Sequence, residues 1–281
     1  MIITYSLKDV EPYINWIYFY HAWGMSGKPE KEKQQLRHEA EALIDEYGQR
    51  YSTYALFNIF QANSEADDIV LDLQTACYEV PQTLVAERQF RLPMLRQQTA
   101  GSDFLSLADF VRPASQGIAD RIAVFATSAD IGMEQDFQSD PYRRMMMQLI
   151  ADRAAEATIE RAHQEIRRLY WGFAPDENFT VDELFAERWQ GIRPAVGYPS
   201  LPDASINFLI DRLLDMKQIG VTITESGAMR PHASVSGLIF SLPAARYFDV
   251  GRIGEDQFAD YARRRGLPAD RLRKFLIRNL E

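Results

Sequence analysis

Residues 190–203 read Gln190-Gly-Ile-Arg-Pro-Ala-Val-Gly-Tyr-Pro-Ser-Leu-Pro-Asp203, with two glycines and three prolines around one arginine, Arg193, and one tyrosine, Tyr198. Proline fixes φ and removes a backbone donor, and glycine permits positive φ, so this stretch cannot form a helix or a central strand. It predicts a rigid loop that holds Arg193 and Tyr198 in place. An arginine held in this way suits bidentate capture of a carboxylate, although composition alone fits an ordinary connection between helices equally well.

The composition limits the classes of protein to which this chain can belong. The chain has 281 residues, of which 46% are hydrophobic and 12% aromatic, so it can fill a sizeable core. No apolar run approaches the roughly 20 residues of a membrane span, and we expect no export leader. The single cysteine, Cys77, excludes an internal disulfide framework and suits a reducing cytoplasm. A formal net charge of -9 argues against a general nucleic-acid binder.

Strand and helix signals are mixed irregularly along the chain. Apolar and alternating runs predict strands at 54–60, 68–73, 121–127 and 221–225, and a hairpin made of 234–240 and 246–250. Helical spacing and capping residues predict helices at 29–47, 140–170, 180–189, 255–265 and 268–278. Because there is no regular β-α-β alternation, we expect a single α+β domain over residues 1–281, with a mainly antiparallel sheet flanked by helices.

The longest predicted helix starts at Asp140-Pro141, an N-cap acid followed by proline at the first helical position. Its apolar stripe is expected to pass through Tyr142, Met145, Leu149, Ile159, Ile166 and Tyr170. The same spacing places Glu156 and His163 near that face. An acid on a core-facing stripe needs a partner or a ligand, whereas an acid at its rim can simply reach solvent. Both readings of Glu156 stay open from the pattern alone.

Three motifs in order along the chain resemble the signatures of one known family. They are Arg188-Trp-Gln-Gly-Ile-Arg-Pro-Ala-Val-Gly-Tyr-Pro199, Thr224-Glu-Ser-Gly-Ala-Met-Arg-Pro-His-Ala-Ser-Val-Ser-Gly237 and Phe240-Ser-Leu-Pro-Ala-Ala-Arg-Tyr-Phe248. With them the chain resembles the activation domain of cobalamin-dependent methionine synthase, which binds S-adenosylmethionine. The likeness extends from about Ile14 to Leu280, and Leu95-Arg-Gln-Gln98 and Leu107-Ala-Asp-Phe-Val111 also have counterparts in that family.

The resemblance implies a binding site for S-adenosylmethionine, which presents a carboxylate, an ammonium, a sulfonium and an adenine. Arg193 would take the carboxylate, and the acids Asp109 and Glu156 would lie near the cationic groups. Tyr198 would sit near the transferable methyl and is the residue implied for the transfer step. The other implied binding residues are Glu187, Ala195, Gly197, Tyr247 and Phe248. On physical grounds alone, Asp109 could instead cap a neighbouring stretch of backbone.

The motifs that are absent narrow the expected role. A zinc-thiolate site needs several cysteines, and the chain has one, so we expect no metal site. The corrin-binding signature Asp-x-His-x-x-Gly is present only in its second half, His21-Ala-Trp-Gly24, with Phe19 in place of the aspartate. The resemblance therefore implies a stand-alone reactivation module. Inactive cob(II)alamin would be carried by a separate methionine synthase chain, reduced by a flavodoxin-like donor and methylated from S-adenosylmethionine.

Departures from the family pattern leave an alternative open. The family usually has a cysteine, a histidine and a lysine where this chain has Ser200-Leu-Pro-Asp-Ala-Ser-Ile206, and Arg230 and His232 replace a tryptophan and a glycine. These changes allow a non-enzymatic S-adenosylmethionine-binding or regulatory protein that has lost its cobalamin-facing surface. The two C-terminal helices also gather arginines, which form either a solvated face or a docking patch for an acidic redox partner.

Overall fold

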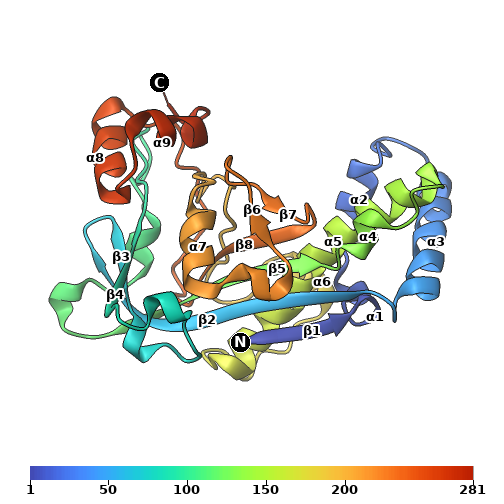
Figure 1. Cartoon of the computed structure of the whole chain (residues 1–281), viewed down its shortest axis with the longest axis horizontal. Helices are drawn as coiled ribbons and strands as arrows, with labels where there is room; N and C mark the ends of the chain where they lie inside the picture. Colours follow the sequence, from blue (N-terminus) through green and yellow to red (C-terminus); the bar gives the residue numbers. More distant parts are fainter. Residues whose placement is uncertain (281) are drawn as a thin grey trace.

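A long strand, β2 (Ser52–Glu65), runs through the middle of the computed structural model, which describes residues 1–280 (Figure 1). It belongs to a six-stranded antiparallel sheet in the order β4-β3-β2-β5-β8, to which β1 is added by pairing with β2. The other strands of this sheet are β1 (Ile2–Ser6), β3 (Asp68–Asp72), β4 (Gln89–Pro93), β5 (Asp120–Ala129) and β8 (Ser234–Phe240). A separate ribbon consists of β6 (Thr222–Ile223) and β7 (Met229–Arg230).

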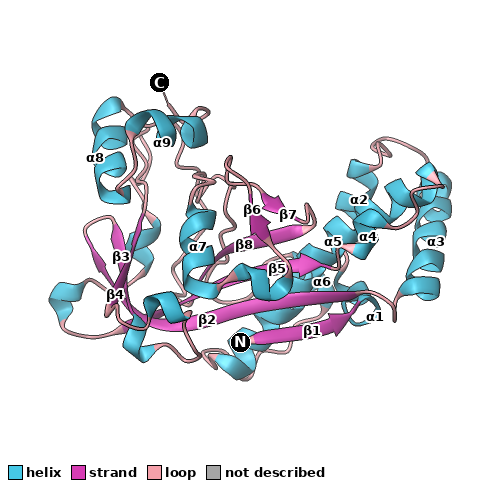
Figure 2. Cartoon of the chain, in the orientation of Figure 1, coloured by secondary structure: helices cyan, strands magenta, loops and turns pink. Residues whose placement is uncertain are grey.

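Helices flank the sheet, as Figure 2 shows. They are α1 (Leu7–Val10), α2 (Trp16–Ala22), α3 (Glu30–Tyr47), α4 (Gly132–Gln135), α5 (Pro141–Glu165), α6 (Val181–Phe185), α7 (Ile206–Leu214), α8 (Glu255–Arg265) and α9 (Ala269–Leu276). The chain is therefore a single α+β domain with a mostly antiparallel sheet, and the predicted fold class is confirmed. None of the helices in the described part of the chain is long and apolar enough to cross a membrane.

The length of β2 lets it pair with three neighbours. Its first half pairs with β1, with Leu56 opposite Ile2, and its second half pairs with β3, with Glu65 opposite Asp68. On its other edge β5 pairs along almost the whole strand. The strand's two edges are thus covered over most of its length, which leaves few free backbone groups in the middle of the sheet.

Side chains of β2 alternate between two cores, because successive residues of a strand point to opposite faces. Phe57 and Ile59 join the core that contains α5, and Leu56 and Phe60 join the core that contains α7. These four side chains are almost fully buried. Burial of a side chain of this size contributes about 1.5–3 kcal/mol relative to leaving it exposed.

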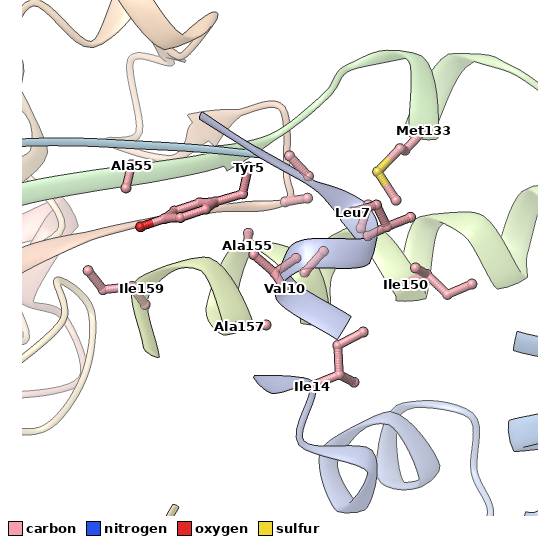
Figure 3. Packing of buried hydrophobic residues seen from close by; sticks show 14 of the residues in the cluster. Tyr5, Leu7, Val10, Ile14, Ala55, Met133, Ile150, Ala155, Ala157 and Ile159 are labelled. Carbon is pink, nitrogen blue, oxygen red and sulfur yellow. The ribbon is translucent and has the colours of Figure 1, made fainter. Parts of the chain in front are cut away.

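Helix α5 lies against the sheet through small residues. Asp140 caps it by accepting hydrogen bonds from the backbone N–H groups of Tyr142 and Arg143, at 3.1 and 3.0 Å. Figure 3 shows alanines of α5 beside Tyr5, Leu7, Val10 and Ile14 of the N-terminal segment. The helix ends at Glu165 and continues as a π-helical turn through Tyr170, so the predicted bounds of 140 and 170 are close to the observed ones.

The predicted apolar stripe of this helix is wrong at its start. Tyr142 and Met145 are exposed, whereas Met146 and Met147 are buried. The first turns of α5 face α2 and α3 rather than the sheet: Tyr142 donates to Glu39 and its ring packs edge-on against Trp23. Tertiary contacts with two other helices therefore set which side of this turn is buried.

In the C-terminal part of the chain, one prediction is confirmed and another is wrong. Helices α8 and α9 lie where they are predicted, and they form a third small core with Leu95, Val250 and Ile253. The predicted second strand of a hairpin at 246–250 is wrong. This segment is irregular because its backbone bonds to the loop that follows Arg193: Val250 N–H donates to Pro199 O at 3.0 Å.

Candidate functional site

The stretch around Arg193 lies along β8, at the edge of the sheet. Ile192 exchanges two backbone hydrogen bonds with Phe240, at 3.1 and 2.9 Å, and Val196 N–H donates to Ser236 O at 2.9 Å. The carbonyl of Pro194 accepts from Leu238 N–H at 3.1 Å. Pro194 has no backbone N–H to donate, but its carbonyl accepts a hydrogen bond from β8. The stretch is therefore held in place, as its composition predicts.

Gly237 of β8 makes this close approach possible. A Cβ atom at this position would stand 2.3 Å from Pro194 O and 2.9 Å from the ring of Phe125. No side chain fits there, so the small residue lets the Arg193 stretch lie directly on the strand.

A cavity of about 670 Å³ opens between this stretch, α5 and the segment around Tyr247. Its volume lies within the usual range for small-molecule sites. The lining residues come from six parts of the chain: Tyr18, Phe125, Arg153, Glu156, Ile159, Glu160, Glu187, Arg193, Pro194, Ala195, Tyr198, Pro199, Ser200, Val235, Tyr247 and Phe248.

At the wall of this cavity, the side chain of Arg193 contacts one turn of α5. Its guanidinium donates to the carboxylate of Glu160, to the carbonyl of Ile159 at 3.2 Å and to Nδ1 of His163 at 3.4 Å. The side chain is only 12% exposed, and the charge on Glu160 favours its ionised form. Arg193 is therefore a fixed cation at the cavity wall.

Behind Arg193 lies a buried polar layer. The imidazole of His163 is completely buried and packs edge-on against Trp189, with ring centroids 4.7 Å apart. Burial, together with the charges of Arg167 and Arg193, holds the pKa of His163 well below 6.5, so the ring is neutral and Nδ1 can accept. Arg167 in turn forms a buried ion pair with Glu177, with Nη2 and Oε1 2.7 Å apart.

Three acids surround the remaining space. Glu156 pairs with Arg153, with 2.8 Å between Oε2 and Nη1, and keeps 35% of its side chain exposed. Burial raises the pKa of Glu156 above 4.5, and it raises that of Glu187 in the same way. With Glu160, the cavity wall carries three carboxylates and two guanidiniums, a formal charge of -1. This sign favours a cationic ligand.

Tyr247 and Phe248 fix the opposite wall. The hydroxyl of Tyr247 accepts a hydrogen bond from the backbone N–H of Arg193 at 3.1 Å, and burial raises its pKa to about 12. Ser200 bridges to Phe248, donating to its carbonyl and accepting from its N–H at 3.0 Å. The two segments are thus tied to each other by side-chain to backbone bonds.

Tyr198 stands at the mouth of the cavity, with 58% of the residue exposed. The turn that presents it depends on Gly197, whose φ is +89° and whose N–H donates to Leu201 O at 2.8 Å. A residue with a side chain would be strained in this conformation. Gly197 itself is not among the lining residues within the described chain, so it shapes the turn rather than the wall.

Asp109 lies elsewhere. Its carboxylate forms a bidentate pair with Arg96, with both distances 2.7 Å, and accepts the N–H of Ser106 in a capping box. It borders a different depression and is not among the residues of the described chain that line the cavity around Arg193. The structure therefore gives Asp109 the capping role that was the alternative, and it does not bring this acid to Arg193.

The cavity also contains residues that the sequence did not single out. Arg153 and Glu160 lie three residues before and four residues after Glu156, a spacing that puts them on the same face of α5 and could have identified them. Tyr18 comes from α2, and no local pattern connects that helix to Arg193. Within residues 1–280 no group of three His, Cys, Asp or Glu side chains could hold a metal ion.

The stretch that departs from the family pattern is mostly internal. Ser200, Leu201, Asp203 and Ser205 are buried, and Asp203 accepts from the hydroxyl of Tyr261 at 2.8 Å. These residues therefore change the packing behind the cavity rather than an exposed face. His232, in contrast, is exposed and lies 3.2 Å from a carboxylate oxygen of Asp152.

Comparison with known proteins points to one family over nearly the whole chain. Residues 6–266 match the family model described as the vitamin B12 dependent methionine synthase activation domain. The chain is also similar to a crystal structure of the MetH reactivation domain bound to AdoHcy, with 34% sequence identity and a TM-score of 0.89, covering 100% of this chain and 90% of that one. The family and the fold are both shown, and the chain belongs to the activation domains of vitamin B12-dependent methionine synthase.

Proposed function

We propose that the cavity beside Arg193 binds S-adenosylmethionine, and that the chain supports reductive methylation of inactive cob(II)alamin on a separate methionine synthase chain. The observation that carries this proposal is the composition of the cavity wall. Two guanidiniums, one of them the fixed group of Arg193, and three carboxylates line a space of about 670 Å³. S-adenosylmethionine carries one carboxylate and two cationic groups, so its charges complement those of the wall.

The predicted roles of the lining residues follow from their positions. Arg193 takes the carboxylate of the ligand, because its guanidinium is fixed and charged. Glu156 and Glu187 lie near the ammonium and the sulfonium. Tyr198, at the cavity mouth, lies beside the methyl that is to be transferred, and Ala195, Tyr247 and Phe248 offer backbone groups and flat faces to the adenine.

The partner's cobalamin would supply the nucleophile for the methyl of the sulfonium after a flavodoxin-like donor has given it one electron, and S-adenosylhomocysteine would be the product that remains. The residues of this chain bind and orient the donor. The open mouth beside Tyr198 supports this arrangement, because the methyl has to be accessible from outside the cavity. No side chain here needs to act as a nucleophile, so catalysis rests on positioning.

Calorimetry with S-adenosylmethionine tests the binding step. Replacing Arg193→Ala should weaken binding by on the order of 2–5 kcal/mol, the cost of removing one partner of a buried charged contact. Arg212→Ala is a matched control, since this arginine is exposed and pairs with Glu87 away from the cavity. Absence of binding heat with the unaltered protein, or equal affinity in the Arg193→Ala variant, would refute the proposal.

A second assay separates reactivation from binding alone. The alternative function is a non-enzymatic S-adenosylmethionine-binding or regulatory protein. An oxidised methionine synthase that lacks its own activation domain is mixed with this chain, an electron donor and S-adenosylmethionine. Restored turnover supports the reactivation role, whereas ligand binding without any recovery favours the regulatory one.

A further inference from the structure

Glu160 holds the guanidinium of Arg193 in the direction of the cavity. Its carboxylate accepts from Nη2, while Nη1 donates to Ile159 O and to His163 Nδ1. All three acceptors belong to a single turn of α5. A guanidinium is planar, so contacts at both of its terminal nitrogens fix its plane as well as its position.

Other acids compete for the same cation. Glu156 and Glu187 line the cavity, and the charge of Arg193 acts on both of them. Without Glu160, the guanidinium would be drawn toward one of these carboxylates. It would then no longer face the space that the carboxylate of a ligand has to enter, and an acid meant for the cationic groups would be occupied.

Glu160 itself is part of the wall rather than of the core. Its side chain keeps 20% of its surface exposed, and it lines the cavity. Ala157 and Ile159, which precede it along α5, are buried residues that pack into the core. Truncating Glu160 therefore removes a contact to Arg193 without opening a cavity in the core.

We propose that Glu160 is a positioning residue that makes the site selective for ligands with a free carboxylate, by holding Arg193 in its binding orientation. This inference rests on the proposed function. It goes beyond the assignment of Arg193, because it places the specificity for the amino-acid end of the ligand in a side chain that does not itself contact the carboxylate.

Three ligands distinguish this role from the alternatives. S-adenosylhomocysteine carries the whole amino-acid end, its decarboxylated analogue keeps the ammonium but has no carboxylate, and 5′-methylthioadenosine has neither group. Affinities for all three are measured by calorimetry with the unaltered protein, Glu160→Ala and Glu160→Gln. Glu46→Ala, which removes an exposed acid on α3, is the control, and thermal unfolding of each variant reports on the fold.

For Glu160→Ala we expect S-adenosylhomocysteine to bind about 10- to 100-fold more weakly, the range found when the hydrogen-bond partner of a metal-binding side chain is removed. Affinities for the two ligands without a carboxylate should differ from those of the unaltered protein by no more than about threefold. A change this small is expected when the substituted residue and the ligand act independently. Glu160→Gln should recover part of the loss, because its amide oxygen can still accept from Nη2.

Each other outcome overturns the inference. Equal weakening of all three ligands would mean that Glu160 only supports the shape of the cavity. Weakening of the decarboxylated analogue as well, with 5′-methylthioadenosine unaffected, would mean that Glu160 binds the ammonium directly. Unchanged affinity for S-adenosylhomocysteine would remove its role altogether. If the unaltered protein bound none of the ligands, the proposed function would fail first, and this inference with it.

Discussion

Arginines meet opposite surroundings in two regions of this molecule. In the C-terminal helices, acids and hydroxyl groups within the fold take up the guanidiniums: Arg264 contacts Asp68 and Asp260, and Arg265 donates to Ser205. At the cavity, two arginines face three carboxylates that line an open space. The first region connects segments that are distant in the sequence, whereas the second places its ion pairs on the wall of a cavity.

The difference shows why a run of charges in a sequence is hard to interpret. The two segments predicted as C-terminal helices carry seven basic residues: Arg263, Arg264, Arg265, Arg271, Arg273, Lys274 and Arg278. Four of them are held in ion pairs: Arg263, Arg264, Arg265 and Arg273. A docking patch for an acidic partner needs charges that are free to meet it, and these four already have acidic neighbours. The cavity is the stronger candidate for recognition, because its charged side chains line a space large enough for a small ligand.

The largest expected effect comes from breaking a pair in the first region. In Arg264→Met the buried carboxylate of Asp68 loses its contact at 2.6 Å and keeps only Arg91, at 3.5 Å. The free energy of unfolding should fall by on the order of 3 kcal/mol, because a buried charge is left poorly compensated. Affinity for S-adenosylmethionine should stay within about twofold, since the two regions share no contacts.

Urea unfolding and calorimetry on the same variant check both parts. For Arg193→Ala we expect a large loss of affinity together with a loss of stability, because its guanidinium also pairs with Glu160. If Arg264→Met lost ligand affinity while its unfolding midpoint stayed unchanged, the C-terminal helices would belong to the binding machinery and the contrast between the regions would be wrong.

Much of the fold could be predicted because its signals are local. The strands at 54–60 and 121–127 alternate or run apolar over their whole length, and α8 ends just before Gly266, whose φ is +62°. The segment 246–250 has the alternation of a strand as well. Its hydrogen bonds go instead to Pro199 and Ser200, about 50 residues earlier, and no local pattern reports such a contact.

The candidate site likewise contains residues that the sequence could predict and residues that it could not. Glu156 follows from helical spacing and from the resemblance, and the same spacing would have extended to Arg153 and Glu160. Tyr18 could not have been found, because its place at the cavity depends on how α2 packs. Asp109 does not line this cavity, and a motif match cannot reveal that its carboxylate pairs with Arg96; its role in ligand binding stays a prediction.

A smaller effect is expected from pH, and it concerns the second region. Burial raises the pKa of Glu156 and Glu187 above 4.5, so both acids become charged only as the pH rises through a range above that value. The affinity for S-adenosylmethionine, relative to that for S-adenosylhomocysteine, should increase over the same range by about tenfold or less, because solvent screens a partly exposed pair. The ratio isolates the sulfonium charge, which only the first ligand carries.

Without a ligand, the contribution of these two acids to the stability of the protein should decrease as the pH rises. A carboxyl whose pKa is higher in the folded than in the unfolded state holds its proton more tightly when folded, so its contribution to stability is lost as the pH rises through the folded-state pKa. Titrations between pH 4.5 and 7 with both ligands measure the ratio, and Glu156→Gln should flatten it. A ratio that falls with rising pH would show that these acids do not face the sulfonium.

The smallest effect is expected where an ion pair lies on the surface of the protein. Arg273 forms a bidentate pair with Glu255, at 3.0 and 2.9 Å, and its guanidinium lies over the ring of Phe258. Arg273→Met keeps a long apolar stem over that ring, so we expect an unchanged midpoint in urea unfolding, since exposed pairs gain little from their attraction. The rate of reactivation by an acidic electron donor should also be unchanged at low salt, because Glu255 already neutralises this arginine. A slower rate that recovers at high donor concentration, with stability intact, would show that Arg273 attracts the donor despite its pairing, and the C-terminal helices would then act as a docking face.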